Sequence, residues 1–276
     1  MTELPVDRHR AVERAAEGEF DLVVFSDIWR SFGIFAQLGP QLAGLPSTRV
    51  AVIDGADRRE MYPYAGKWWR CRSWWFLPRA KNATYFKREI SEFSYWTRAY
   101  LMLPPQIARR LGLMKAVRPV SISIPPDEIV ATPPEKDQLL ARDIVDPEMR
   151  DGRGVSVEHY PFESADEYIA DLRRSQFGIT LKRAGWDALR HYEQAAAGCV
   201  PCFRDLDQKP PRCAPYGLDA TNCVPYSDVE PLMRRLRSMS PTEYAALQHA
   251  SIAWARSNST IAAAERFLGE LGMSGS

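Results

Sequence analysis

Continuous apolar runs bounded by polar residues mark the first strands of the chain. DLVVFSD (21–27) and RVAVIDGAD (49–57) both follow this pattern, which is typical of strands buried in a parallel sheet. Between them, IWRSFGIFAQLGPQL (28–42) predicts a helix. The alternation of strand and helix indicates an α/β fold.

The pattern is most regular after residue 153. It predicts a strand at 154–160, a helix at 164–175, a strand at 176–182, a helix at 186–198 and a strand at 200–205. Ser164 and Glu167 have the spacing of a capping box, which supports a helix start there. This order predicts a parallel sheet with right-handed crossovers, and the tail at 227–271 is expected to be helical.

Proline-bearing stretches divide the chain into two halves. Residues 104–105 and 119–126 carry prolines and read as a linker into a new strand, so we place a domain boundary near residue 117. Residues 1–117 and 118–276 are then expected to form two α/β domains facing each other across a cleft, with the last helix returning to the first domain. Residues 126–153 are interpreted as a helix-containing connection.

The bulk composition is that of an ordinary globular protein. The 276 residues are 45% hydrophobic and 26% charged, with a formal charge of +1, so nothing in the overall charge favours nucleic acid as a partner. No apolar run approaches the ~20 residues of a membrane span, and the start lacks the apolar core of a signal peptide. We therefore expect a cytoplasmic location.

Five cysteines, an odd number, argue against a secreted disulfide framework. Cys199 and Cys202 form a CxxC, and with Cys213 and Cys223 they offer four thiolates. The second pair is too widely spaced to present two zinc ligands together. We expect these residues to be small buried thiols and the protein to hold no metal.

Carboxylates follow both strands of the amino-terminal half. Asp27 ends the first run, and Asp54 and Asp57 end the second, at the edge where open α/β sheets place their ligands. These three aspartates and His9 are the candidates for a catalytic base. Alternatively, the aspartates cap the turns or helices that follow.

Residues 67–90 interleave tryptophan with arginine and lysine, most densely in the Trp-rich segment 67–76. Trp68 and Trp75 would share a helix face. Three uses are open: packing between domains, a stacking platform for an acceptor sugar, or an interfacial belt at membrane headgroups. We expect packing, with membrane contact at most peripheral, because arginines interrupt the apolar face.

Two cations follow the strand at 176–182. Lys182 and Arg183 come just before the helix that is expected to begin near Gly185. Free N–H groups and the dipole at a helix start favour an anion such as a diphosphate. The alternative is that both cations are solvated loop charges.

Arg190 and Glu193 lie three residues apart on the predicted helix. They can pair with each other on one face, or reach separately toward phosphate and ribose hydroxyls, and the spacing does not choose between the two. The alanines and Gly198 that follow let the helix lie close against its sheet before the next strand.

The stretch GITLKRAGWDALRHYEQAAAGCVPCFRDL (178–206) resembles the donor-binding signature of GT-B glycosyltransferases, especially the exostosin-like and group-1 bacterial kinds. The resemblance implies two Rossmann-like domains, here with an abbreviated amino-terminal acceptor-side domain and a carboxyl-terminal nucleotide-sugar-binding domain. It implies that Glu193 accepts hydrogen bonds from ribose hydroxyls, that Lys182, Arg183 and Arg190 face the phosphates, and that Gly198 shapes the turn beside the nucleotide. Gly185 stands where many group-1 members have an acidic residue.

The expected activity is that of a metal-independent glycosyltransferase without a cofactor. Its partners would be a nucleotide-sugar donor and an unidentified acceptor, whether glycan, lipid-linked sugar or small molecule. A non-catalytic nucleotide-sugar or partner-binding homologue is the alternative, since the first half is short and shows no clear catalytic base. A nicotinamide-dependent oxidoreductase is disfavoured because no GxGxxG follows the first strand.

Overall fold

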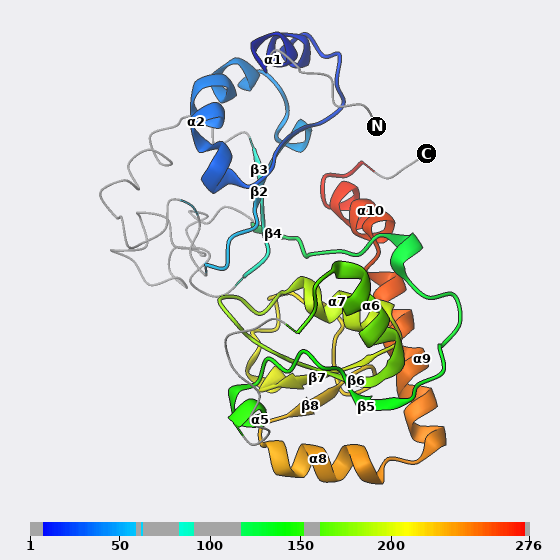
Figure 1. The fold of residues 1–276 in the computed structure, drawn as a ribbon. Coiled ribbons are helices and arrows are strands. Elements are labelled where there is room, and N and C mark those ends of the chain that lie inside the picture. The colour runs from blue at the N-terminus through cyan, green and yellow to red at the C-terminus, as the bar shows by residue number, and fades with distance from the viewer. Residues whose placement is uncertain (1–7, 59–61, 63–82, 91–116, 152–160, 274–276) are drawn as a thin grey trace. The chain divides into compact units, whose positions relative to one another are not determined.

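A computed structural model describes residues 8–58, 62, 83–90, 117–151 and 161–273 of the chain. It divides into two compact units, the first comprising Met1–Val120 with Phe267–Ser276 and the second Ser121–Arg266. Each unit contains one four-stranded sheet whose strands are all parallel. The α/β class expected from the sequence is therefore observed in both units (Figure 1).

The sheet of the first unit has the strand order β1-β2-β3-β4. Its strands are β1 (Val23–Phe25), β2 (Val50–Asp54), β3 (Thr84–Lys87) and β4 (Val117–Pro119), and its helices include α1 (Arg8–Ala16) and α2 (Ile28–Leu38). The two apolar runs thus form neighbouring strands as predicted, with α2 between them. The strand β3 was not predicted.

Both faces of β2 are covered, which explains its continuous apolar sequence. Val50 and Val52 join the cluster that contains Phe35 of α2, whereas Ala51 packs with Phe86 and Leu271. Successive residues of a strand point to opposite faces, so one strand contributes to two cores.

The carboxyl-terminal part of the chain covers the second face of this sheet. The helix α10 (Thr260–Glu270) brings Phe267 against Phe86, with 4.3 Å between ring centroids, and Leu271 is fully buried next to Ala51. The last helix therefore returns to the first unit, as expected from the sequence.

The sheet of the second unit has the strand order β5-β6-β7-β8. Its strands are β5 (Gln138–Leu140), β6 (Ser175–Leu181), β7 (Val200–Arg204) and β8 (Val224–Tyr226). Its helices are α5 (Pro147–Asp151), α6 (Ala165–Arg174), α7 (Leu189–Ala196), α8 (Val229–Ser238) and α9 (Pro241–Ser257), while α10 begins within it.

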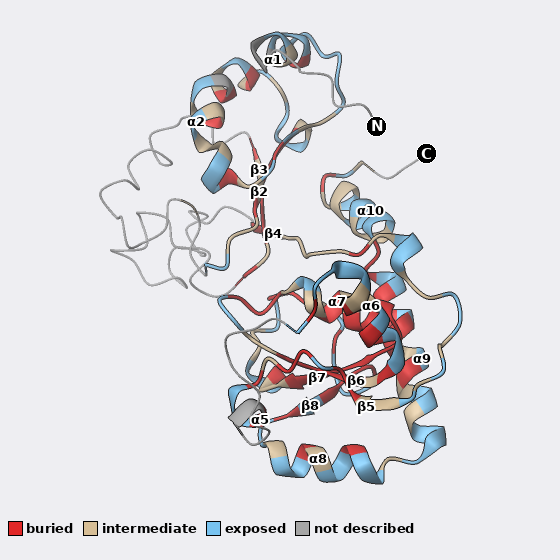
Figure 2. Ribbon diagram, in the orientation of Figure 1, coloured by how far each residue is buried: buried red, intermediate tan, exposed pale blue. Residues whose placement is uncertain are grey.

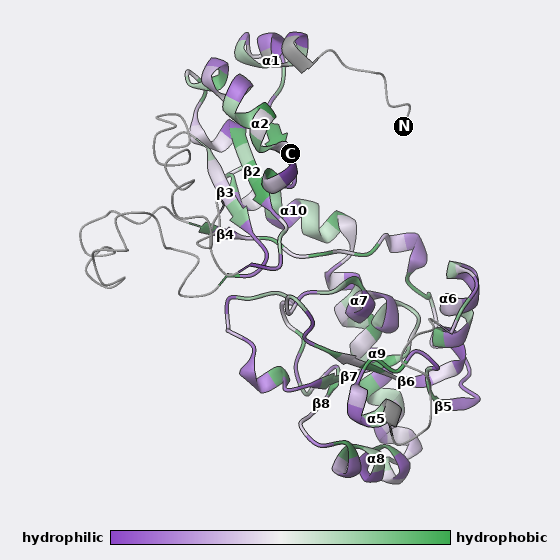
Figure 3. Cartoon of the chain, turned by 60° about the vertical axis from the view of Figure 1, so that its left-hand side comes forward, coloured by the Kyte–Doolittle hydropathy of each residue, from purple (hydrophilic) through white to green (hydrophobic). Residues whose placement is uncertain are grey.

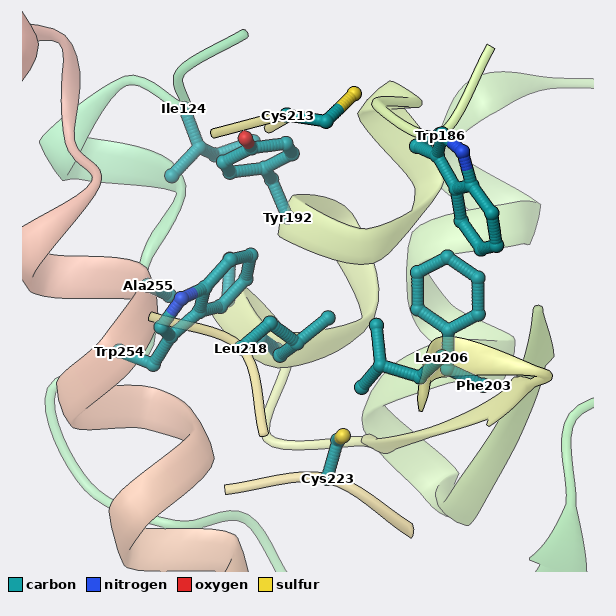
Figure 4. Packing of buried hydrophobic residues seen from close by; sticks show 12 residues of the cluster. Ile124, Trp186, Tyr192, Phe203, Leu206, Cys213, Leu218, Cys223, Trp254 and Ala255 are labelled. Carbon is teal, nitrogen blue, oxygen red and sulfur yellow. The ribbon is translucent and has the colours of Figure 1, made fainter. Parts of the chain in front are cut away.

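Helices cover both faces of the second sheet. On one face, α7 and α9 enclose a cluster in which Tyr192 packs on Trp254 and Phe203 of β7 lies beside Trp186 (Figure 4). On the other face, α8 packs on Cys202 and its neighbours. The central strands β6 and β7 are mostly buried, whereas the outer side of α8 is exposed (Figure 2). In the first unit, Figure 3 shows β2 in the green of hydrophobic residues.

Two elements of the second unit differ from the sequence prediction. The strand expected at 154–160 lies outside the described residues, and the strand beside β6 is β5, within a stretch interpreted as a helix-containing connection. This interpretation was incomplete, because 126–153 holds both β5 and α5. A strand of three residues is too short to show the alternation of apolar and polar positions from which strands are predicted.

Within the described residues, no helix combines the length and the apolar character needed to cross a membrane. The Trp-rich segment 67–76 lies outside the described residues, so its use stays a prediction.

Candidate functional site

The cations after β6 lie at the carboxyl edge of the second sheet. Lys182 follows the last strand residue directly, and its ammonium is 5.1 Å from the centre of the Trp186 ring. Arg183 is exposed, and its backbone N–H donates to the carbonyl of Gly185 at 3.1 Å. Neither cation forms an ion pair with a residue that the structure describes. Both therefore keep a charge that an anion could use.

The helix after this loop starts later than predicted. The segment Gly185–Asp187 is buried, non-helical chain, and α7 begins at Leu189. The Asp187 carboxylate accepts hydrogen bonds from the Ile122 backbone N–H at 2.8 Å and from the Tyr192 hydroxyl at 2.7 Å. These bonds hold the loop in a non-helical conformation, which local propensity does not reveal.

Glu193 lies in the second turn of α7, and its side chain faces α6. The hydroxyl of Tyr168 donates to Glu193 Oε2 at 3.1 Å. Among the described residues, this is the one hydrogen bond recorded for the Glu193 carboxylate. Burial raises the pKa of Glu193 above its usual value, while the bond from Tyr168 and the nearby Arg190 act in the opposite direction.

Arg190, one turn earlier on α7, forms an ion pair with Asp143 rather than with Glu193. Asp143 follows β5, so this pair joins the neighbouring strand to the start of α7. Both side chains are largely buried, with 19% of Arg190 and 6% of Asp143 exposed. Arg190 and Glu193 therefore do not pair with each other, and their reach toward phosphate and ribose hydroxyls stays a prediction.

A pocket of about 800 Å³ lies along α6 and α7. Glu193 and Tyr168 belong to its wall, together with Glu128, Ile169, Arg173 and Leu189. The wall combines apolar side chains with a few polar groups, which is the usual composition of a small-molecule site. Lys182 and Arg183 are not part of this wall.

Gly198 lies at the other end of α7 from the cations. It precedes β7 at the amino edge of the sheet, whereas Lys182 follows β6 at the carboxyl edge. Its φ of +66° ends the helix, and a Cβ at this position would lie 2.9 Å from Cδ of Pro134. The structure assigns Gly198 a helix-ending role and does not bring it together with Lys182.

The three aspartates of the first unit have different surroundings. Asp54 is fully buried, 2.9 Å from the Lys87 ammonium and 2.6 Å from the Tyr85 hydroxyl. Asp57 is exposed and pairs with Arg88. These partners commit the carboxylates of Asp54 and Asp57 to other side chains.

Asp27 occupies the N-cap position of α2 without capping it. Its backbone is left-handed, with φ 47° and ψ 67°, and its side chain accepts no cap hydrogen bond. A Cβ on Gly55 would lie 2.8 Å from Asp27 Oδ1, so the next strand's loop leaves space for this carboxylate. Asp27 thus lies between β1 and α2, as expected from the sequence, but its side chain does not make the bond that the capping alternative requires, and its role as a base stays a prediction.

Several polar residues at the carboxyl edge of the second sheet were not predicted as candidates. They are Asp143, Asp146, Tyr168, Arg204 and Tyr226. Asp146 is fully buried, accepting from Arg204 at 2.8 and 2.9 Å and from Tyr226 at 2.7 Å. The signal that could have found the two aspartates is ARDIVD (141–146), which directly follows a strand.

The cysteines of the described chain are buried free thiols. They are Cys199, Cys202, Cys213 and Cys223. Burial raises the pKa of Cys199 and of Cys223 to about 12, which keeps both protonated at neutral pH. No group of three or more His, Cys, Asp or Glu side chains gathers into a metal-binding cluster within the part of the chain that is described. That the protein holds no metal stays a prediction.

No protein-family model matches the sequence, and the search of curated proteins gives no match.

Solved structures share a broadly similar course of the chain at very low sequence identity. The crystal structure of TarM aligns with 84% of this chain and 57% of its own at 9% identity and a TM-score of 0.42. The N-terminal domain of Candida albicans trehalose-6-phosphate phosphatase aligns with 89% of this chain and 75% of its own chain, at 9% identity and a TM-score of 0.47. The GtfA/B complex aligns with 96% of this chain and 60% of its own chain, at 11% identity and a TM-score of 0.45.

This chain thus spans less than two thirds of the aligned chains of TarM and of the GtfA/B complex. Similarity at this level carries no argument about activity, ligands or partners.

Proposed function

We propose that the protein is a glycosyltransferase that moves a sugar from a nucleotide diphosphate sugar to an acceptor. The observation that carries the proposal is the setting of Glu193. Its half-buried carboxylate lines a pocket of about 800 Å³, with one recorded hydrogen-bond donor among the described residues. A carboxylate accepts two hydrogen bonds from neighbouring hydroxyls well, which suits the ribose of a nucleotide.

In this proposal, Lys182 and Arg183 bind the diphosphate of the donor. Lys182 and Arg183 have no ion-pair partner among the described residues and precede the amino end of α7. Gly185 is buried in the same loop, and Arg190 is in the first turn of the helix. The resemblance of residues 178–206 to a donor-binding signature is the second support, because it assigns the same residues to the same ligand.

In mechanism, the cations would stabilise the negative charge that grows on the departing diphosphate. Preorganised electrostatic groups of this kind contribute several kcal/mol in other enzymes. We propose that the reaction needs no metal and no cofactor. In this proposal residues 1–117 bind the acceptor, which is a glycan, a lipid-linked sugar or a small molecule, and residues 118–276 bind the donor.

If the reaction inverts the sugar carbon, a base must take the acceptor proton. Of the three aspartates, Asp27 is the candidate that we favour, because Asp54 and Asp57 are engaged with Lys87 and Arg88. We propose a cytoplasmic location, no nucleic-acid partner and at most peripheral contact with membranes.

A screen of nucleotide sugars for thermal stabilisation tests the donor. UDP-, GDP-, ADP- and dTDP-linked sugars are added separately, and a ligand at 100 times its Kd adds about 2.7 kcal/mol of stability. The best donor is then incubated with the protein, and release of nucleoside diphosphate is measured with and without candidate acceptors. Stabilisation with no release under any condition would favour a binding protein without turnover, and no stabilisation by any donor would contradict the proposal.

A further inference from the structure

Two opposite charges on α7 are held apart by partners from other elements. Arg190 and Glu193 are three residues apart, a spacing at which an arginine and a glutamate on a helix can pair. Instead, Arg190 bonds Asp143 and Glu193 accepts from Tyr168. The Glu193 carboxylate is therefore not paired with Arg190, whose charge is met by Asp143.

The partners come from distant parts of the second unit. Asp143 lies 47 positions before Arg190, in the segment after β5, and Tyr168 lies 25 positions before Glu193, in α6. Tyr168 is buried, and its ring packs against Phe162 with 5.4 Å between centroids. A fixed ring holds its hydroxyl in a fixed place, so the direction of the bond to Glu193 is set by packing.

The exchange of partners has an electrostatic consequence. Were Arg190 bonded to Glu193, the carboxylate would be neutralised and its lone pairs occupied. A phenol hydroxyl occupies one oxygen but supplies no formal charge. Glu193 thus keeps acceptor capacity toward the pocket.

We propose that Tyr168 and Asp143 are positioning residues that keep the Glu193 carboxylate available to the ligand of this pocket, Tyr168 by orienting it and Asp143 by holding Arg190 away from it. The proposal rests on the function proposed above, in which that ligand is a nucleotide diphosphate sugar. Tyr168 orients the carboxylate that receives the ribose hydroxyls, and Asp143 withdraws the guanidinium that would otherwise cover it.

Removal of each partner has an opposite effect on the protonation of Glu193. The bond from Tyr168 lowers the pKa of Glu193, and the charge of Asp143 raises it. Tyr168→Phe should therefore raise the Glu193 pKa, whereas Asp143→Asn should lower it, all the more when the released Arg190 turns to Glu193. The titratable groups that act on Glu193 are Tyr168, Arg190, Glu128 and Asp143. Asp166, Arg173 and Arg174 of α6 line the same pocket.

The first measurement needs no ligand. The pKa of Glu193 is followed by the carboxyl-carbon NMR shift of protein labelled with [5-13C]glutamate, with Glu193→Gln used to assign the signal. We expect an upward shift in Tyr168→Phe and a downward shift in Asp143→Asn. The matched control is Tyr226→Phe, which removes a buried hydroxyl bonded to Asp146 and should leave the Glu193 pKa unchanged.

The second measurement is the affinity for UDP, GDP, ADP and dTDP by calorimetry at pH 8. Both variants should bind the preferred diphosphate about 3- to 10-fold more weakly than the wild type, the equivalent of one hydrogen bond. The loss should be larger at low pH for Tyr168→Phe, because a carboxylate with a higher pKa is protonated earlier. Circular dichroism confirms that each variant is folded.

The two measurements distinguish failure of the positioning role of Tyr168 and Asp143 from failure of the proposed function. If the pKa of Glu193 does not move in opposite directions, or if both variants bind as tightly as the wild type, Tyr168 and Asp143 are not positioning residues. If the pKa moves as expected but the wild type binds none of the diphosphates, the proposed function fails, and with it the role of both residues toward a ligand.

Discussion

The ammonium of Lys87 lies 2.9 Å from the carboxylate of Asp54, and both side chains are closed to solvent. The two residues are register partners on the adjacent strands β2 and β3. Tyr85 also donates its hydroxyl to Asp54 at 2.6 Å. In a buried ion pair each charge compensates the other, so removal of one partner leaves an uncompensated buried charge and is strongly destabilising.

Lys87→Met should therefore destabilise the first unit strongly. We expect a loss of about 3–5 kcal/mol in the free energy of unfolding, because the variant leaves a buried carboxylate without its counter-charge. Urea unfolding followed by circular dichroism measures the loss. The double variant Lys87→Met/Asp54→Leu should recover a large part of it.

The control for this prediction is the exposed pair of Arg14 and Glu19 in the same unit, with 49% and 44% of the two side chains exposed. Glu19→Ala should cost less than about 1 kcal/mol, as exposed ion pairs do. Equal losses for Lys87→Met and Glu19→Ala would contradict the distinction that we draw between the two pairs.

Glu193→Ala tests the donor site directly. If the carboxylate accepts two ribose hydroxyls, the change should weaken nucleotide-sugar binding by about 1.5–3 kcal/mol while the fold stays largely intact. Calorimetric titration of wild type and variant with the best donor measures the difference. Glu243→Gln, a change in an exposed carboxylate that pairs with Arg235, is the control and should not alter affinity. Equal affinities in wild type and Glu193→Ala would remove the main support for the proposed function.

His191 predicts a pH dependence of stability. Its ring is fully buried, with Nδ1 accepting from the Thr180 hydroxyl at 2.8 Å and Nε2 donating to the Trp186 carbonyl at 2.9 Å. Burial lowers the pKa of His191 from 6.5 to about 4. The unfolded chain then binds a proton between pH 6.5 and 4 that the folded chain does not, so stability falls as the pH falls through this window.

The expected contribution of His191 to this loss is about 3 kcal/mol. Unfolding by urea at several pH values, for wild type and for His191→Gln, measures it. The variant should be less stable near pH 7 but should lose less stability between pH 6.5 and 4. Parallel pH profiles for the two proteins would show that the histidine titrates alike in both states.

Gly178 on β6 lies directly under the side chain of Gln194 on α7. A Cβ at Gly178 would be 2.5 Å from Gln194 Cδ, so Gly178→Ala should cost about 1–3 kcal/mol. Adding Gln194→Ala should reduce this cost, because it removes the atoms that clash. Gly33→Ala in α2, where the added Cβ meets nothing within 4 Å, should be neutral or stabilising. Thermal unfolding of the wild type, Gly178→Ala, Gln194→Ala and the double variant measures the coupling, and Gly33→Ala is the control.

Much of the fold follows from local patterns. The run VAVID, buried on both faces, identified β2, and the capping box of Ser164 and Glu167 marked the start of α6, where Ser164 does accept from the Glu167 N–H. The close packing of α7 could also be predicted, because the small residues Ala195, Ala196 and Ala197 are buried as expected. These features depend on residues near one another in sequence.

Other features depend on distant partners and could not be predicted. The strand β3 includes Lys87, which a sequence pattern places at the surface until Asp54, 33 residues earlier, supplies its counter-charge. The partners of Arg190 and Glu193 are likewise far away along the chain. The late start of α7 results from the bonds of Asp187 to Ile122 and Tyr192. In each case a tertiary hydrogen bond overrides local preference.

The packing of Phe267 on Phe86 and of Leu271 beside Ala51 makes the first unit discontinuous in sequence. A gene fragment that stops at residue 120 would encode β1 to β4 but would lack Phe267 and Leu271, which pack on one face of this sheet. Such a fragment should aggregate, whereas joining residues 260–273 to it through a flexible linker should restore solubility. Expression of the first unit on its own therefore requires two separate segments of the chain.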